Sequence, residues 1–394
     1  MRASSKIAKL LTIITAVSAA AAAVVLPAAG APASGVRAEA SKAICLGRET
    51  VPLATAALKR NRKDPLGYLC RARVYLELRN YRRALTDLST AIKLKPADSE
   101  LYVERAQVYL NRDNLNRALN DLNRAIAIKP NARAYRERGA VYAGLGDFAR
   151  ALTDVDAALK LQPASGDLYV FRGQLYVGRE NFKLAERSAP DTQALETLTP
   201  ELLPQALRAH DAALAQADFE FALKLDVRMA EAHYGLALAR RSLAAEELGR
   251  QPERITQALT SIEQALELKP DYLDALLLKA EMLAMKDDYE GARAVADAAV
   301  KALPQAPQAY SYRARLLLDT RDYSSALSDA LRAIRLDKQL AEPYCVRATV
   351  YSETGKRRLA LREFNTCLRL AGNREIRDWA SDELNALSIP ASMR

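Results

Sequence analysis

The chain has 394 residues, with 58 lysines and arginines against 48 aspartates and glutamates, and a formal net charge of +10. This excess is modest for the length and favours association with anionic surfaces such as lipid headgroups or acidic proteins. Only two histidines occur, and the sequence holds no glycine-rich phosphate loop, clustered metal ligands or nucleophile motif. Composition therefore argues against an enzyme and against a bound cofactor.

Residues 1–40 have the features of an export signal. Arg2, Lys6 and Lys9 precede an uncharged apolar run over residues 10–26, and small residues follow, with candidate cleavage sites after Ala33 and Ala40. The pattern is typical of bacterial secretory signals and predicts a periplasmic or secreted protein. The run is nearly long enough to span a bilayer, so an uncleaved anchor with the chain facing the periplasm is the alternative. Only in that case do we expect membrane contact.

A single helix is predicted next, within residues 41–64. Leu53, Ala54 and Ala57 recur at helical spacing over residues 51–59 and would cap the structure that follows. From residue 65 a period appears, because similar segments end at positions 96, 130 and 163, as AIKLKP, AIAIKP and ALKLQP. A fixed period in the thirties means that one supersecondary unit has been copied and stacks on its neighbours.

Each unit is predicted to be a helix, a turn and a second helix. Tyr68, Ala72 and Tyr75 recur at steps of four and three, which places them on one face of a first helix. After a break at residues 79–80, Ala84, Leu88 and Ala91 form a similar face on a second helix, which the proline ends.

The unit YLCRARVYLELRNYRRALTDLSTAIKLKP resembles the tetratricopeptide repeat. Eight copies can be aligned over residues 65–370, with the lead residues Tyr68, Tyr102, Tyr135, Tyr169, His233, Leu276, Tyr310 and Tyr344. The resemblance implies an all-α fold, a right-handed superhelical solenoid with capping helices at both ends. The second cap is expected in residues 371–394, where Ile376, Trp379, Leu384 and Leu387 give residues 374–387 an apolar face.

Charged residues recur together in these copies. Most carry an arginine three residues after the lead residue, and an acid sixteen residues further on; where copies five and six have Leu236 and Lys279, the acid is also replaced, by Ser261 and Val295. Arginines in register could grip an anionic partner, but this joint loss favours ion pairs between the two helices of a copy. The predicted structural pairs are Arg71–Asp87, Arg105–Asp121, Arg138–Asp154, Arg172–Asp218, Arg313–Asp329 and Arg347–Glu363.

Copy four is interrupted. Its first helix contains Arg172, but the matching acid is Asp218, so an insertion over residues 186–211 is predicted to separate the two helices. The insertion holds three prolines and is expected to be a loop with one short helix over residues 200–209. A loop added to a rigid solenoid can determine which partner binds, or it can be an insertion that the fold tolerates and that has no role in binding. Copy five carries a shorter insertion over residues 248–253.

Four cysteines fit an oxidising compartment. Cys345 and Cys367 belong to the two helices of copy eight and could form a disulfide, as could Cys45 and Cys70. Buried free cysteines would satisfy the same positions, and a zinc site is disfavoured because no close pair of cysteines occurs.

In the family that the chain resembles, the first helices line a concave face that holds a partner peptide. By that resemblance the candidate groove residues are Leu69, Arg73, Val103, Gln107, Arg136, Val170, Gln174, Tyr234, Leu277 and Arg315. We therefore expect a non-enzymatic scaffold that is exported, binds a protein or peptide partner and acts in envelope assembly or secretion. A membrane-anchored assembly factor or chaperone is the alternative, and no nucleic acid partner is expected.

Overall fold

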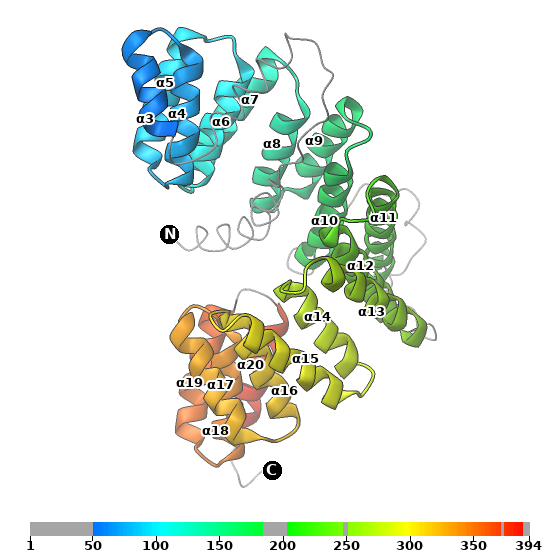
Figure 1. Ribbon diagram of the computed structural model, residues 1–394. Coiled ribbons are helices and arrows are strands. Elements are labelled where there is room, and N and C mark those ends of the chain that lie inside the picture. Colours follow the sequence, from blue (N-terminus) through cyan, green and yellow to red (C-terminus); the bar gives the residue numbers. More distant parts are fainter. Residues whose placement is uncertain (1–49, 184–202, 247–250, 372–373, 389–394) are drawn as a thin grey trace. The chain divides into compact units, whose positions relative to one another are not determined.

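The computed structural model describes residues 50–183, 203–246, 251–371 and 374–388, and within them every regular element is a helix (Figure 1). The predicted all-α class is therefore confirmed. The chain divides into two compact units, residues 1–168 and residues 169–394, which we describe separately.

Unit 1 contains seven helices in the described residues. They are α3 (Thr50–Arg60), α4 (Pro65–Glu77), α5 (Tyr81–Leu94), α6 (Ser99–Leu110), α7 (Leu115–Ile128), α8 (Ala132–Gly144) and α9 (Phe148–Leu161). The pairs α4/α5, α6/α7 and α8/α9 form copies one to three, and the second helices α5 and α7 also pack on the first helices α6 and α8 of the next copy. The helix α3 packs on α4 as the predicted cap.

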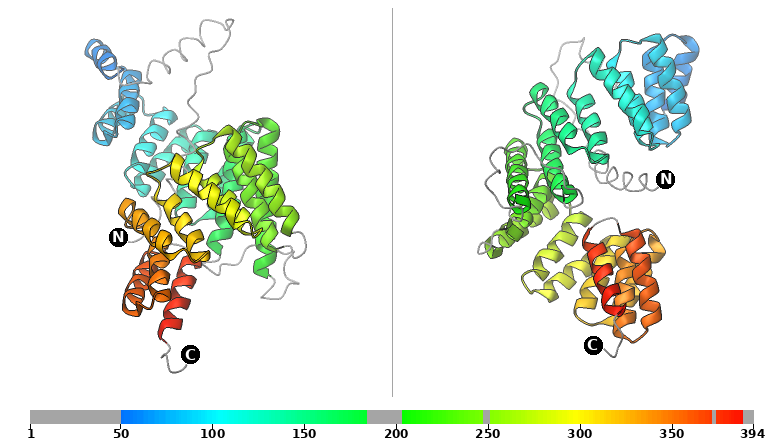
Figure 2. Two further views of the ribbon diagram at one scale, coloured as in Figure 1. Left: turned by 60° about the horizontal axis from the view of Figure 1, so that its bottom comes forward. Right: turned by 180° about the vertical axis from the view of Figure 1, so that it is seen from behind.

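Unit 2 contains the remaining helices. They are α10 (Gly166–Lys183), which begins just before the division, α11 (Leu203–Leu225), α12 (Ala230–Glu246), α13 (Gln251–Leu268), α14 (Leu273–Ala284), α15 (Tyr289–Ala302), α16 (Pro307–Asp319), α17 (Tyr323–Leu336), α18 (Glu342–Glu353), α19 (Arg357–Leu370) and α20 (Arg374–Ser388). The last helix packs on α18 and α19 and buries Ala380 and Leu387, so it closes the array (Figure 2).

Small residues set how closely the helices approach. The alanines at 84, 91, 118, 125, 151 and 158 are fully buried in the second helices of unit 1. Their short side chains let neighbouring backbones come close, and larger side chains such as Leu88 and Leu122 fill the space between pairs. Each copy therefore buries its apolar face on its neighbours.

Asparagine and aspartate begin the second helices. The side chains of Asn80, Asn114 and Asp147 accept a hydrogen bond from the backbone N–H three residues later, which satisfies a free donor of the first turn. The residue before each cap has a positive φ, 54° at Arg79, 56° at Asp113 and 82° at Gly146. The chain thus reverses in three or four residues and brings the two helices together.

In five copies the lead residue also closes the preceding turn. The hydroxyl groups of Tyr68, Tyr102, Tyr310 and Tyr344 donate to the carbonyl oxygen six residues earlier. In copy five His233 takes this role, with Nε2 2.8 Å from the carbonyl oxygen of Val227. The preference for tyrosine, or histidine, at this position therefore reflects a polar atom at the tip of a ring as well as packing.

The two insertions lengthen the hairpins that carry them. The helix α11 runs without a break from Leu203 to Leu225, so the residues expected to form a separate short helix continue into the second helix of copy four. Arg172 pairs with Asp218, and seven residues further out on both helices Arg179 pairs with the buried Asp211. The hairpin keeps its register for two more turns. Residues 184–202 and 247–250 lie outside the described residues.

Candidate functional site

The arginines and acids that recur sixteen residues apart lie in contact. Two guanidinium nitrogens face both carboxylate oxygens, for example Arg71 Nε 2.7 Å and Nη2 2.8 Å from Asp87, and Arg138 Nε 2.8 Å and Nη2 2.6 Å from Asp154. Arg105–Asp121, Arg172–Asp218 and Arg313–Asp329 have the same arrangement, and Arg347 pairs with Glu363. All six acids are buried. Two parallel bonds to a planar guanidinium fix the angle between the helices as well as their separation.

Several of these arginines also reach back to the preceding copy. Nη1 of Arg105 donates to Ser89 Oγ at 3.3 Å and Nη1 of Arg313 to Asp297 Oδ1 at 2.8 Å, each sixteen residues earlier. Nη1 of Arg71 makes the same bond to Thr55 of α3, at 3.2 Å, so the cap occupies the place of a second helix. One arginine thus ties three helices together. The polar residue sixteen positions before the arginine was a sequence signal for this bridge.

Copies five and six use different residues at this place. Arg240, which stands where other copies have their second tyrosine, donates from Nη1 to Ser261 Oγ at 2.6 Å and to the carbonyl oxygen of Gln257 at 3.0 Å. In copy six Lys279 Nζ lies 3.2 Å from Glu263, again sixteen residues earlier. Copy five therefore keeps a polar link between its own two helices, whereas Lys279 of copy six links its first helix to the second helix of copy five.

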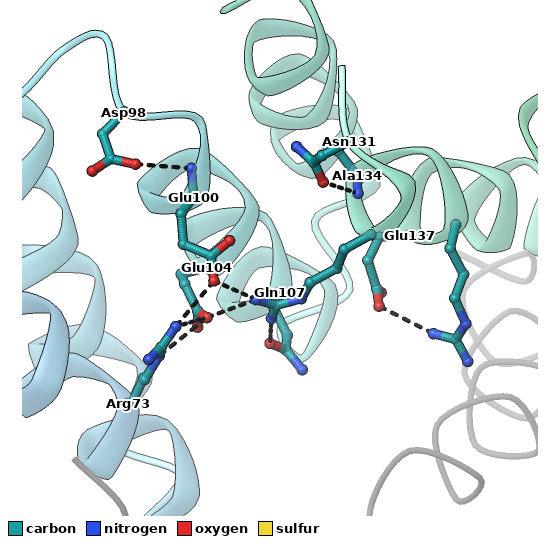
Figure 3. A network of polar contacts seen from close by, with 10 residues as sticks. Arg73, Asp98, Glu100, Glu104, Gln107, Asn131, Ala134 and Glu137 are labelled. Atoms are coloured by element: carbon teal, nitrogen blue, oxygen red, sulfur yellow. Dashed lines mark hydrogen bonds and ion pairs between the residues drawn. The ribbon is translucent and has the colours of Figure 1, made fainter. Parts of the chain in front are cut away.

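In unit 1 the first helices are joined across their inner face by a second ionic network. Glu104 on α6 accepts hydrogen bonds from Arg73 on α4, at 2.7 Å, and from Arg133 on α8, at 2.9 Å (Figure 3). Arg133 also donates to Glu100 and Gln107. Three successive copies are thereby connected through one buried carboxylate.

In unit 2 the first helices line a groove. A hollow of about 300 Å³ is bordered by α12, α14, α16, α18 and α20. It adjoins a second hollow of about 590 Å³ that is bordered by Trp379 and Glu383 of α20 and shares Glu281, Tyr312 and Arg315 with the first. We call the two together the unit-2 groove. Its apolar and aromatic lining includes Tyr234, Leu238, Leu277, Leu278, Tyr312, Ile376 and Trp379.

The charged residues of the unit-2 groove are mostly acidic. Arg241 lies 3.1 Å from Glu281, and Arg315 lies 3.2 Å from Glu342 and stacks on Tyr312. Asp274 and Asp319 add two more carboxylates, and loss of hydration in the groove raises the pKa of both. Burial also raises the pKa of Tyr312 to about 12 and that of Tyr234 further. Five acids against two arginines give the groove an excess of negative charge.

Comparison with known families agrees with this architecture. Models described as tetratricopeptide repeat match residues 106–176 in one case and residues 70–133, 250–307 and 287–341 in another, about half of the chain together. The chain belongs to the tetratricopeptide repeat family. Proteins of this family mediate interactions between proteins and are generally not enzymes. No curated protein matches the chain.

Among solved structures, a tetratricopeptide repeat protein from Parabacteroides merdae is similar, with a TM-score of 0.53 and 17% identity over 74% of this chain and 99% of that one. Human IFIT1 bound to m7Gppp-AAAA is similar with a TM-score of 0.50 and 17% identity, covering 84% of this chain and 72% of that one. At these identities the likeness concerns the fold. No helix in the described part of this tetratricopeptide chain is long and apolar enough to cross a membrane.

The repeat geometry corrects several expected groove residues. Leu69, Val103 and Val170, which follow the lead tyrosines, are only 8%, 1% and 3% exposed, so they belong to the core between repeats and not to an open surface. Arg73 and Gln107 are held in the ionic network of unit 1, and Arg136 Nη1 lies 3.2 Å from Glu137. Gln174 is half-buried on α10. Of the ten candidates, the structure brings Tyr234, Leu277 and Arg315 together in the unit-2 groove.

The cysteines of the eighth repeat form a disulfide. Cys345 on α18 and Cys367 on α19 are joined with a Cα–Cα distance of 5.4 Å, and both are fully buried. Cys70 is also disulfide-bonded, and Cys45 lies outside the described residues. The described residues contain no free cysteine and no group of histidine, cysteine and acidic side chains that could hold a metal ion.

We predict that Glu104→Gln destabilises unit 1 by about 2–4 kcal/mol at pH 7, because two half-buried guanidinium groups lose their shared counter-charge. Burial by itself would raise the pKa of Glu104, but Arg133 and Arg73 outweigh it and hold the pKa below its usual range. A carboxyl group with a lowered pKa stabilises the fold above the pKa of the unfolded chain and loses that effect as the pH falls. The loss of stability caused by Glu104→Gln should therefore become smaller below about pH 4.

Urea unfolding followed by circular dichroism at several pH values measures this deficit. Glu137→Gln is the control, because Glu137 pairs with one arginine of its own helix and is partly exposed; its loss should cost at most about 1 kcal/mol. A deficit for Glu104→Gln that stays constant between pH 7 and pH 3 would contradict the electrostatic role.

Proposed function

We propose that the chain is a scaffold that binds a segment of a partner protein in the unit-2 groove. The observation that carries this proposal is the groove itself, which combines aromatic and aliphatic walls with a surplus of carboxylates. Apolar walls anchor side chains of an extended or helical segment, and the charged groups select among segments. The interaction role of the family supports the same class of function.

The partner segment is proposed to carry lysine or arginine side chains beside apolar anchors. Arg241 and Arg315 are each matched by a glutamate, whereas Asp274 and Asp319 have partly lost hydration. A cationic side chain in the groove would restore favourable interactions for these carboxylates. The surplus of acids also disfavours a polyanion at this site, so the absence of a nucleic acid partner stays a prediction.

The scaffold is proposed to work outside the cytoplasm, in envelope assembly or secretion. The basic residues at positions 2, 6 and 9, the apolar run over residues 10–26 and the disulfides support this location. An assembly factor that keeps the apolar run as an anchor is the second candidate. Mass spectrometry of the native N-terminus distinguishes them, since a chain that starts near Ser34 or Ser41 has lost the anchor.

Site-specific photo-crosslinking tests the groove. A photoreactive amino acid at Leu277, in the groove, is expected to capture a partner peptide that contains lysine or arginine next to apolar residues. The same amino acid at Leu268, which is exposed on α13 away from the groove, is the matched control. Charge reversal by Glu281→Lys together with Glu342→Lys should reduce the crosslinks at Leu277 at least tenfold.

Equal crosslinking from Leu277 and Leu268, or crosslinks that persist after charge reversal, would refute the groove as the binding site. The charge-reversal variant must keep its helical circular dichroism, because both glutamates also pair with arginines.

A further inference from the structure

Charge is distributed unevenly between the two units. Unit 1 has 21 basic and 13 acidic residues between positions 50 and 168, whereas unit 2 has 31 basic and 33 acidic residues between positions 169 and 394. In unit 1 most of the arginines of the ion pairs are neutralised by buried acids. The remaining excess of basic side chains must therefore lie on the surface of unit 1.

Much of this surplus gathers at one edge, where first helices end and second helices begin. Because copies one to three stack in register, their three turns follow one another along the same edge. This turn edge carries the exposed side chains Arg79, Arg82, Arg83, Arg112, Arg117 and Arg150, against three acids, Glu77, Asp113 and Asp147. The edge thus keeps a positive charge.

Three of the arginines occupy one register position and are held by aromatic rings. Arg83, Arg117 and Arg150 are the third residues of α5, α7 and α9, and their Cζ atoms lie 5.6, 5.7 and 4.6 Å from the ring centroids of Tyr75, Tyr109 and Tyr142. Stacking orders the guanidinium planes while the side chains stay exposed, and Arg150 also donates from Nε to Asp147 Oδ2 at 2.5 Å, so part of its charge is matched. Copies six and seven have Gly291 and Ser325 at this position, so the repeat fold does not require an arginine there.

Two leucines stand between these arginines. Leu78 and Leu145 are the C-cap residues that follow α4 and α8, and they are 43% and 47% exposed. An exposed leucine side chain costs free energy in water, and it would contribute nothing to a contact with phosphates alone. A row of basic side chains with protruding apolar side chains is typical of a surface that binds an anionic bilayer. Charge would attract the edge to the headgroups, and the leucines would enter the boundary of the acyl chains.

From this juxtaposition we propose that the turn edge of unit 1 binds an anionic lipid bilayer peripherally, with Arg83, Arg117 and Arg150 at the phosphate groups and Leu78 and Leu145 inserted. The site differs from the unit-2 groove and does not depend on whether that groove binds a protein. The proposed contact is made by residues of the folded repeats, so it also differs from an anchor at residues 10–26.

Tryptophan fluorescence in the full chain can test this contact. The chain has one tryptophan, so Leu145→Trp in a Trp379→Phe background gives a single probe at the turn edge. Leu161→Trp is the matched control, because Leu161 is 48% exposed at the opposite end of the same hairpin. Vesicles of brominated phosphatidylglycerol should quench the probe at 145 at least threefold more than the probe at 161, and brominated phosphatidylcholine should not.

A second test removes the charge of the three stacked arginines. Arg83→Gln, Arg117→Gln and Arg150→Gln together should weaken the vesicle-dependent quenching at 145 roughly a hundredfold in lipid concentration, since each basic side chain near an anionic surface contributes about a fivefold factor. The control removes three exposed arginines of unit 2, by Arg228→Gln, Arg321→Gln and Arg358→Gln, with the same change of net charge. It should leave the quenching unchanged.

Equal quenching at 145 and 161, quenching by phosphatidylcholine alone, or equal losses in the two triple variants would overturn the proposal. Binding of RNA or an acidic protein that needs the same arginines, without quenching of the probe at 145 by brominated lipid, would assign the edge to a polyanion and also overturn it. Because both probes share the N-terminal run, insertion of residues 10–26 cannot produce the difference between them.

Discussion

Replacing Asp154 by alanine should lower the free energy of unfolding of unit 1 by about 3–5 kcal/mol. The substitution leaves the Nε and Nη2 groups of Arg138 without the buried carboxylate that accepts from both, at 2.8 and 2.6 Å. Tyr135 and Tyr142 flank the same guanidinium and limit the access of water to it. Urea unfolding followed by circular dichroism measures the loss.

Two controls separate burial from charge in this prediction. Glu263→Ala removes a carboxylate that also pairs sixteen residues away, with Lys279, but is exposed, so it should cost at most about 1 kcal/mol. Replacing both partners, by Arg138→Leu and Asp154→Leu, should recover much of the loss, because no buried charge is then unpaired. A loss below 1 kcal/mol for Asp154→Ala would show that water solvates the arginine.

Replacing Phe219 by alanine should lower the stability of unit 2 by about 3–5 kcal/mol, as expected for the loss of a fully buried ring. This ring of α11 packs between Gly173 on α10 and Gly235 on α12. A Cβ atom would come within 2.8 Å of the ring at Gly173 and 2.3 Å at Gly235. The two glycines therefore make room for a phenylalanine where copies one to three have a leucine or valine.

A second substitution tests this fit from the glycine side. Gly235→Ala should cost about 1–3 kcal/mol by overpacking, and Phe219→Leu should relieve part of that cost in the double variant. Thermal unfolding of the four proteins gives the coupling energy. Additive effects of the two substitutions would mean that the ring does not fill the space at Gly235.

Local patterns predicted the hairpins well, because spacing of apolar residues and the arginine–acid separation are properties of one copy and its nearest neighbour. The pair Arg172–Asp218 was found despite the insertion for this reason. The expectation that Leu69 and Val103 lie on an open groove surface was wrong. Their burial depends on the rotation of the first helix of the next copy relative to them. Neither residue type nor period specifies that rotation.

The unit-2 groove could be predicted only in part. Tyr234, Leu277 and Arg315 follow from the register of the first helices, but Glu342 and Ile376 enter from two later helices, and the matching of Arg315 with Glu342 depends on distances between copies. The same register in unit 1 gives the network around Glu104. Which outcome occurs is decided by side chains about thirty residues apart in sequence.

The bridging arginines also affect how the array unfolds. Because Arg71 holds the cap helix α3 and Arg105 the second helix of copy one, each in addition to the second helix of its own copy, part of their energy belongs to the coupling between neighbours. Strong coupling makes partial opening costly, since freeing one hairpin breaks bonds in two. The copies of unit 1 should therefore exchange their amide hydrogens as a single cooperative block, with fraying confined to its ends.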